Sequence, residues 1–374
     1  MTEFAEHLRN PIRAKGKKRI LTCDGGGILG LMAVEVLGAI ETLLRKETGK
    51  PDLVLGDWFD MCAGTSTGAM IATCVAYGMP VDEIRKFYTE HGRDMFDKAF
   101  LLKRIYYSYD DEPLAKTLKK TFGEATTLGT DRLRTLLMVV TRNATTDSPW
   151  PITNNPYAKY NDSSRNDCNL KLPLWKIVRA STAAPTYFPP ERVSLGTKEF
   201  MFVDGGVTTY NNPALLAFNT VTASPYGINW LASEDKLFIV SLGCGSAAAV
   251  SNNFSDSGPN LLNSAINVIS GLMNAATAGH DMTCRILGKC LYGEPIDREI
   301  WDLVGTTGPA HPKLFTYLRY NPETTREGLD RLDLTNIDPK RVQTLDAIDA
   351  IPDIQAVGQA MAKKVKLEHF QGFI

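Results

Sequence analysis

The stretch Gly64-Thr65-Ser66-Thr67-Gly68 decides the fold that this sequence predicts. It fits the pattern G-x-S-x-G, in which a serine lies on a sharp turn between a strand and a helix. Residues 58–63 before it form a short apolar run typical of a buried strand, and residues 69–77 after it are compatible with a helix. Glycines flank the serine because a side chain at either place would collide with neighbouring backbone in so tight a turn. The pattern makes Ser66 a candidate nucleophile.

A second glycine-rich loop, Asp24-Gly25-Gly26-Gly27-Ile28-Leu29-Gly30, lies upstream. A short strand is predicted just before it, and apolar spacing predicts a helix over 28–47. Backbone N–H groups at a helix start bind an anion, here either a phosphate or the oxyanion of an acyl-transfer intermediate.

The same loop also satisfies the dinucleotide fingerprint G-x-G-x-x-G through Gly25, Gly27 and Gly30. That fingerprint expects an acidic residue at the end of the next strand, whereas Glu41 and Glu47 fall on the predicted helix. A dinucleotide-binding protein in which Ser66 is dispensable therefore stays an alternative. The candidate nucleophile after the next strand favours the interpretation that the glycine loop binds an oxyanion rather than a dinucleotide.

The third motif is Asp204-Gly205-Gly206, which follows the apolar residues Phe202 and Val203. Asp-Gly is also a common turn. A serine hydroxyl needs a neighbouring base to become a nucleophile, however, and an aspartate beside glycines can approach it closely. A Ser–Asp–His triad is an alternative, because His280 and His311 follow Asp204 in the order that α/β-hydrolases use.

These three motifs, in this order, resemble those of the patatin-like phospholipases. Residues 180–190 are also similar to the segment before that family's catalytic aspartate, and the resemblance covers about residues 18–245. It implies that Ser66 is the nucleophile and Asp204 the general base of a dyad without histidine. It further implies an oxyanion hole and a set of motif glycines: Gly25, Gly26 and Gly27 for the hole, and Gly30, Gly64, Gly68, Gly205 and Gly206 for the motifs.

The resemblance implies a membrane phospholipid substrate, no cofactor and no metal. Many members carry Arg or Lys where this chain has Leu29, so help from a cation in holding a lipid phosphate is in doubt; Asp-Gly-Gly in place of Asp-Gly-Ala is a smaller departure. An ungated lysophospholipase or thioesterase would use the same dyad, and a non-catalytic storage protein is the alternative from another class.

The chain is also similar to bacterial patatin-like effectors of anti-phage defence (CBASS), which cyclic dinucleotides switch on. This similarity implies a cyclic dinucleotide activator and degradation of the cell's own membrane. Two long polar segments, 143–170 and 244–260, are interpreted either as surface excursions or as a lid or regulator pocket. Four side chains in or directly before the segment 143–170 have the chemistry to stack on bases and contact phosphates: Arg142, Trp150, Tyr157 and Arg165.

Composition agrees with a globular enzyme: the chain has 374 residues, 44% of them hydrophobic, and a formal net charge of −1, which favours no nucleic acid polymer. Seven cysteines without metal or disulfide spacing predict reduced core thiols, as in cytoplasm. Residues 1–18 have no apolar signal region, and no run approaches eighteen apolar residues. We expect a cytoplasmic protein that acts at the inner face of the membrane; the oligomeric state stays open.

The alternation of elements predicts an α/β, patatin-like three-layer fold with a mainly parallel central sheet and helices on both faces. We expect an N-terminal arm over 1–17, a catalytic domain over 18–260, and a mainly helical C-terminal extension over 261–374 packed on the same core. The expected strands are 19–23, 57–63, 135–141, 200–203 and 237–242, and the expected helices are 28–47, 67–77, 81–92, 112–121 and 174–182.

Overall fold

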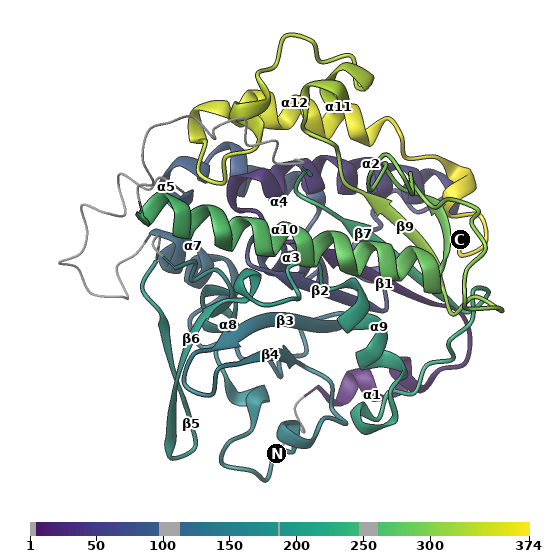
Figure 1. The fold of residues 1–374 in the computed structure, drawn as a ribbon. Coiled ribbons are helices and arrows are strands. Elements are labelled where there is room, and N and C mark those ends of the chain that lie inside the picture. The colour runs from purple at the N-terminus through teal and green to yellow at the C-terminus, as the bar shows by residue number, and fades with distance from the viewer. Residues whose placement is uncertain (1–4, 97–112, 186–187, 247–260) are drawn as a thin grey trace.

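The computed structural model describes residues 5–96, 113–185, 188–246 and 261–374, with side chains of the last range described from residue 271 on (Figure 1). A nine-stranded sheet lies at its centre in the order β5-β6-β3-β2-β1-β7-β9-β8, and β4 pairs with β3. The strands are β1 Lys18–Cys23, β2 Met61–Thr65, β3 Leu136–Asn143, β4 Ser148–Thr153, β5 Glu191–Leu195, β6 Lys198–Asp204, β7 Leu237–Leu242, β8 Lys289–Tyr292 and β9 Thr316–Tyr320.

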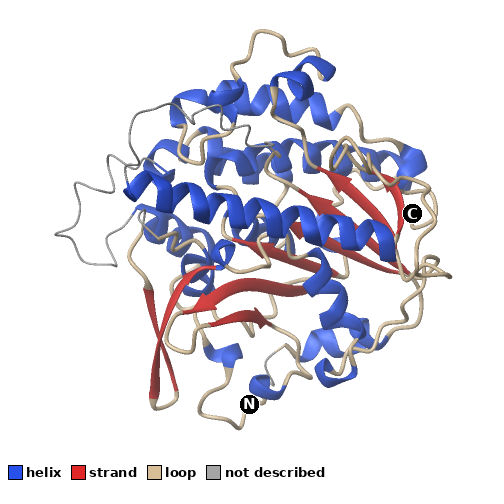
Figure 2. Ribbon diagram, in the orientation of Figure 1, coloured by secondary structure: helices blue, strands red, loops and turns tan. Residues whose placement is uncertain are grey.

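Six strands, from β3 through to β8, run parallel to their neighbours, whereas β4, β5 and β6 join antiparallel at one edge. Figure 2 shows helices surrounding this sheet. Strands β2 and β7 are buried along their whole length, as expected for parallel strands that are covered on both faces. The predicted mainly parallel α/β fold is confirmed.

The helices of at least eight residues are α2 Gly30–Thr48, α3 Thr67–Ala76, α4 Val81–Thr89, α7 Pro113–Phe122, α8 Leu174–Ser181, α9 Ala214–Thr222, α10 Leu261–Leu287 and α12 Ile351–Ala362. The shorter ones are α1 Arg9–Arg13, α5 Gly92–Phe96 and α11 Arg326–Arg331. In Figure 1, α10 crosses in front of the sheet and α12 lies above α2. Ile354, Val357 and Met361 of α12 are buried, so this helix is docked on the core.

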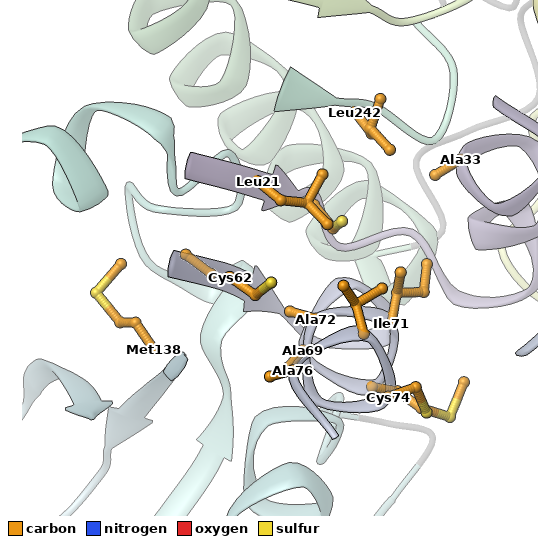
Figure 3. Close-up of a cluster of buried hydrophobic side chains, with 14 of the residues drawn as sticks. Leu21, Ala33, Cys62, Ala69, Ile71, Ala72, Cys74, Ala76, Met138 and Leu242 are labelled. Carbon is orange, nitrogen blue, oxygen red and sulfur yellow. The ribbon is translucent and has the colours of Figure 1, made fainter. Parts of the chain in front are cut away.

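Small side chains let α3 approach the sheet closely. Ala69, Ala72 and Ala76 are fully buried on α3, and Figure 3 shows them beside Cys62 of β2. All seven cysteines are buried with free thiols. Burial that removes apolar surface from water is the main term holding α3 in place, and α3 in turn holds the turn that precedes it.

One helix in the described part of the chain, Gly27–Thr48, has the length and hydropathy of a membrane span, with a mean hydropathy of 1.8. Glu35 and Glu41 interrupt this helix, so it is not an unbroken run of eighteen apolar residues. In addition, 72% of its apolar window is buried inside the fold. The apolar composition has a structural reason, because α2 lies between α12 and the elements around α3 and α4.

Several elements differ from the sequence prediction. The second strand begins at Met61 rather than at residue 57, since residues 55–57 form a 3-10 turn. The C-terminal region contains the expected helices but also β8 and β9, so β7 is not the last strand of the sheet. β8 is only four residues long, and β9 contains the charged residue Arg319. Neither strand therefore gives a clear apolar pattern from which it could be predicted.

The segment 143–170 folds onto the sheet edge. It forms the end of β3, strand β4 and two 3-10 turns, while residues 247–260 of the other long segment lie outside the described residues. The four proposed regulator contacts have partners within the chain: Arg142 pairs with Asp147, Arg165 with Asp167, Trp150 packs on Phe200 and Phe202, and Tyr157 lies under Arg9 and Arg13.

Candidate active site

Strand β3 brings the two candidate catalytic side chains together. Thr65 of β2 lies opposite Val140, and Asp204 of β6 lies opposite the next residue, Thr141, along the same edge of β3, whose other edge pairs with β4. Ser66 directly follows Thr65. The register of three strands therefore places a serine from residue 66 beside an aspartate from residue 204.

The backbone at Ser66 has an unusual conformation, with φ 55° and ψ −124°. Such a conformation in a residue other than glycine costs about 1–3 kcal/mol and persists only where the surroundings enforce it. The surrounding backbone packs so tightly that only glycine fits on either side: a Cβ on Gly64 would lie 2.0 Å from the carbonyl oxygen of Gly68, and a Cβ on Gly68 would lie 2.1 Å from that of Cys23. The predicted strand–turn–helix geometry of the motif is present.

Ser66 and Asp204 are hydrogen-bonded. The Ser66 hydroxyl donates to Asp204 Oδ2 at 2.6 Å, and the N–H of Gly206 donates to Asp204 Oδ1 at 2.6 Å. Asp204 is 5% exposed, and this burial raises its pKa to about 6, against the opposing effects of the two hydrogen bonds and of the Arg179 charge. A carboxylate with a raised pKa is a stronger base than an exposed one and is still ionised at neutral pH.

The hydroxyl of Ser181 at the end of α8 supports the turn from below. It accepts the N–H of Ser66 at 2.8 Å and donates to the carbonyl oxygen of Val140 at 2.6 Å. Ala183 lies two residues after Ser181, and its carbonyl oxygen accepts the N–H of Asp204 at 2.9 Å. The segment that follows α8 thus holds both members of the Ser66–Asp204 pair.

The glycine loop after β1 lies across from this pair. The N–H of Gly25 donates to the carbonyl of Asn211 at 3.2 Å, and that of Ile28 donates to the carbonyl of Leu345 at 3.0 Å. Among the described residues no acceptor is found for the N–H groups of Gly26 and Gly27, and both glycines line the cavity that contains Ser66. A pair of unused backbone donors near a serine is suited to binding an oxyanion.

Asp24, at the start of this loop, is held by a buried arginine. Arg319 of β9 donates to Asp24 Oδ1 at 2.9 Å and to Asp24 Oδ2 at 2.5 Å, and both side chains are almost completely buried. Burial lowers the pKa of Arg319, but the charge and hydrogen bonds of Asp24 outweigh this effect and raise it. A paired arginine therefore fixes the first residue of the loop.

A cavity of about 140 Å³ contains Ser66, Asp204 and the glycine loop. Its described lining is mainly apolar and holds no arginine, lysine or histidine; the larger apolar side chains are Phe96, Leu114, Pro185, Phe188, Val207, Met273 and Leu345. Such a lining suits an acyl chain better than a phosphate group.

Three supporting residues were not predicted from the sequence: Ser181, Arg319 and Asn211. Ser181 lies within the segment 180–190, which resembles the segment before the family's catalytic aspartate but has no motif that marks this serine. Arg319 is a single charged residue among apolar and aromatic neighbours. Among the described residues neither histidine of the alternative triad is hydrogen-bonded to Ser66 or Asp204: His280 contacts the carbonyl of Asn212, and His311 precedes a cis-proline in an exposed loop.

Comparisons with known proteins identify the family. The model of the family "Patatin-like phospholipase" matches residues 21–218. A relative described as a cGAMP-activated phospholipase, from Vibrio cholerae, is 32% identical over 58% of this chain and 59% of its own length. Patatin-16 of Solanum tuberosum is 30% identical over 61% of each chain. The matched part thus spans about three fifths of the length of these relatives.

A solved structure, VipD from Legionella pneumophila, covers 91% of this chain and 67% of its own at 14% identity. Its TM-score of 0.36 is too low for the likeness to bear on this chain.

Proposed function

Because this chain belongs to the patatin-like phospholipase family, we propose that it is a lipid acyl hydrolase that cleaves glycerophospholipid esters through Ser66 and Asp204. The observation that carries the proposal is the 2.6 Å hydrogen bond from the Ser66 hydroxyl to a buried carboxylate in an apolar cavity. An apolar cavity of this kind receives the acyl chain, while the charged headgroup stays at its mouth.

In the first step, Asp204 takes the proton of Ser66 while Oγ attacks the ester carbonyl carbon. The N–H groups of Gly26 and Gly27 stabilise the oxyanion that forms, and one such donor is worth roughly 3–4 kcal/mol of barrier. Asp204 then protonates the departing lysolipid oxygen. Gly25 contributes by shaping the loop, since its own N–H already donates to Asn211.

In the second step, water attacks the acyl-Ser66 ester, Asp204 accepts a proton from it, and the fatty acid leaves as Oγ regains its proton. No cofactor or metal takes part in either step of this proposal. A dinucleotide is a poorer fit to the glycine loop, because the backbone of Leu345 covers Gly27 and accepts the N–H of Ile28, a donor that a pyrophosphate would need.

We further propose that a cyclic dinucleotide switches this activity on, so that the enzyme degrades the cell's own membrane, from its inner face, in anti-phage defence. The support is the Vibrio cholerae relative, which is described as cGAMP-activated. A lipase that reaches its own cell's membrane needs such a gate to avoid constant damage. An ungated lysophospholipase or thioesterase with the same dyad is the second candidate, favoured by the fact that the cavity already opens onto Ser66.

The test is hydrolysis of a fluorogenic phospholipid by the purified protein, alone and with cGAMP and other cyclic dinucleotides, beside Ser66→Ala and Asp204→Asn. Activity that depends on one nucleotide and is lost in both variants supports the gated enzyme. Activity without any nucleotide overturns the gate and keeps the hydrolase. If no condition gives activity and a serine-directed phosphonate leaves Ser66 unlabelled, the hydrolase proposal is wrong.

A further inference from the structure

Asn211 has a buried side-chain oxygen that no described group satisfies. The residue is 7% exposed and lines the same cavity as Ser66, and its Oδ1 has no hydrogen-bond partner in the described part of the chain. A buried acceptor without a partner loses the hydrogen bonds it made to water, so its presence calls for an explanation.

The orientation of this amide follows from its neighbours. Asn211 Nδ2 donates to the carbonyl oxygen of Gly25 at 3.3 Å and to Thr277 Oγ1 at 3.2 Å. A carbonyl oxygen only accepts hydrogen bonds, so the amide nitrogen must face Gly25. The amide oxygen is thereby directed away from Gly25 O, on the side of the reacting groups.

Two glycines locate Asn211 Oδ1 relative to the dyad. A Cβ placed on Gly25 would lie 2.4 Å from Asn211 Oδ1 and 3.1 Å from Ser66 Cβ. A Cβ placed on Gly206 would lie 3.0 Å from both Asn211 Oδ1 and Asp204 Oδ1. The Met273 methyl lies 3.0 Å from the same position. The amide oxygen, the serine and the carboxylate therefore border one small region, and the two oxygens are at most about 6 Å apart, close to the span of one bridging water.

We propose that Asn211 Oδ1 positions the water that hydrolyses the acyl-Ser66 intermediate, an inference that rests on the proposed function above. One hydrogen of this water passes to Asp204 as the water oxygen bonds to the acyl carbon; the other donates to Asn211 Oδ1 and stays on the oxygen. When the bond from the acyl carbon to Oγ breaks, the proton on Asp204 moves to Oγ. The products are the free acid and the regenerated serine.

The proposal distinguishes water from an alcohol. Water has two hydrogens and can donate to Asp204 and Asn211 together, whereas methanol has a single O–H, which Asp204 takes. Loss of the Asn211 acceptor therefore slows hydrolysis of the acyl-enzyme but leaves methanolysis much as it was. The ratio of free acid to methyl ester falls, and this ratio does not depend on how much of the protein is folded.

The experiment measures that ratio with a soluble ester in dilute methanol, under whatever activating condition the wild type requires, for Asn211→Leu and Asn211→Asp. Asn211→Leu removes acceptor and donor at similar volume, and we expect the acid-to-ester ratio to fall by about five- to ten-fold, the worth of one such hydrogen bond. Asn211→Asp keeps the acceptor and loses the Nδ2 donor to Gly25 and Thr277, so it should keep a ratio near that of the wild type at lower total activity. Thr277→Val, the matched control, also keeps the ratio.

An unchanged ratio in Asn211→Leu overturns the proposal, since Asn211 would then only support the glycine loop. If Asn211→Leu does not fold, a lowered ratio in Asn211→Asp overturns it and a retained ratio supports it. Failure of the proposed function is a different result, in which the wild type forms neither acid nor ester and a phosphonate does not label Ser66.

Discussion

Two buried aspartates, Asp24 and Asp204, share one sequence pattern and have opposite surroundings. Asp24 directly follows β1 and Asp204 is the last residue of β6; each is followed by at least two glycines, and each is at most 5% exposed. Asp24 forms two hydrogen bonds with the buried Arg319 guanidinium. Asp204 receives only neutral donors, the hydroxyl of Ser66 and the N–H of Gly206.

The partner, and not the motif, decides what each carboxylate can do. Burial raises the pKa of both groups, but at Asp24 the charge of Arg319 opposes this effect directly. Asp24 is therefore engaged in a bidentate ion pair and is suited to holding the glycine loop. Asp204 forms no ion pair with a described residue, although the Arg179 charge lowers its pKa somewhat, and its pKa of about 6 suits it to taking a proton.

The largest expected effect that tests this contrast is on activity. Asp204→Asn should lower kcat/KM by about 10⁴-fold, because an amide cannot accept the proton of Ser66. The melting temperature should stay the same or rise, since the change removes a buried charge that has no countercharge in contact. Kinetics with a soluble ester and thermal unfolding measure both; a marked loss of stability would place Asp204 in the same structural class as Asp24.

The second effect is on stability. Asp24→Asn or Arg319→Met should each lower the free energy of unfolding by about 3–5 kcal/mol, because each leaves a buried partner unpaired. The double variant should lose less than the sum of the two. Chemical denaturation measures these values.

Arg192→Met provides the control for that experiment. Its exposed pair with Glu199, with side chains 61% and 56% exposed, should be worth less than about 1 kcal/mol. If breaking the exposed pair lowers the free energy of unfolding as much as breaking the buried pair, the role given to Arg319 is contradicted.

A third, smaller effect concerns the support of the turn. Ser181→Ala leaves the N–H of Ser66 without its acceptor and should cost about 1–3 kcal/mol of stability. We expect phosphonate labelling of Ser66 to slow as well, because the strained backbone at Ser66 relaxes. Labelling at the wild-type rate in folded Ser181→Ala would show that the flanking glycines alone maintain the turn.

The smallest effect is a pH dependence. Asp204 acts as a base only when ionised, so kcat/KM should be level above pH 7 and fall about ten-fold per pH unit well below the pKa of about 6. The measurement is the pH profile for a soluble ester, with circular dichroism as the control for folding. A break near pH 4, the ordinary range of an aspartate, would mean that burial does not set the pKa of this group.

Much of the fold followed from local patterns. Residues 20–23, 58–63 and 237–242 are largely apolar runs next to glycine-rich turns, and the α/β class, the glycine loop and the serine turn were predicted with their help. The strands β8 and β9 were missed because one is very short and the other contains Arg319, so neither forms an apolar run of its own. They become strands through pairing with β7 and with each other.

By itself, the sequence determined the family, the mainly parallel α/β fold and the chemical candidates Ser66 and Asp204, because steric demands on glycines and the period of apolar residues are local properties. Only the tertiary structure decided which of two similar aspartates meets the serine. Strand register along one edge of β3 brings residue 204 to residue 66, and β9 brings Arg319 to Asp24 from almost three hundred residues away. The same is true of Asn211, whose free oxygen exists only because the folded glycine loop engages its nitrogen.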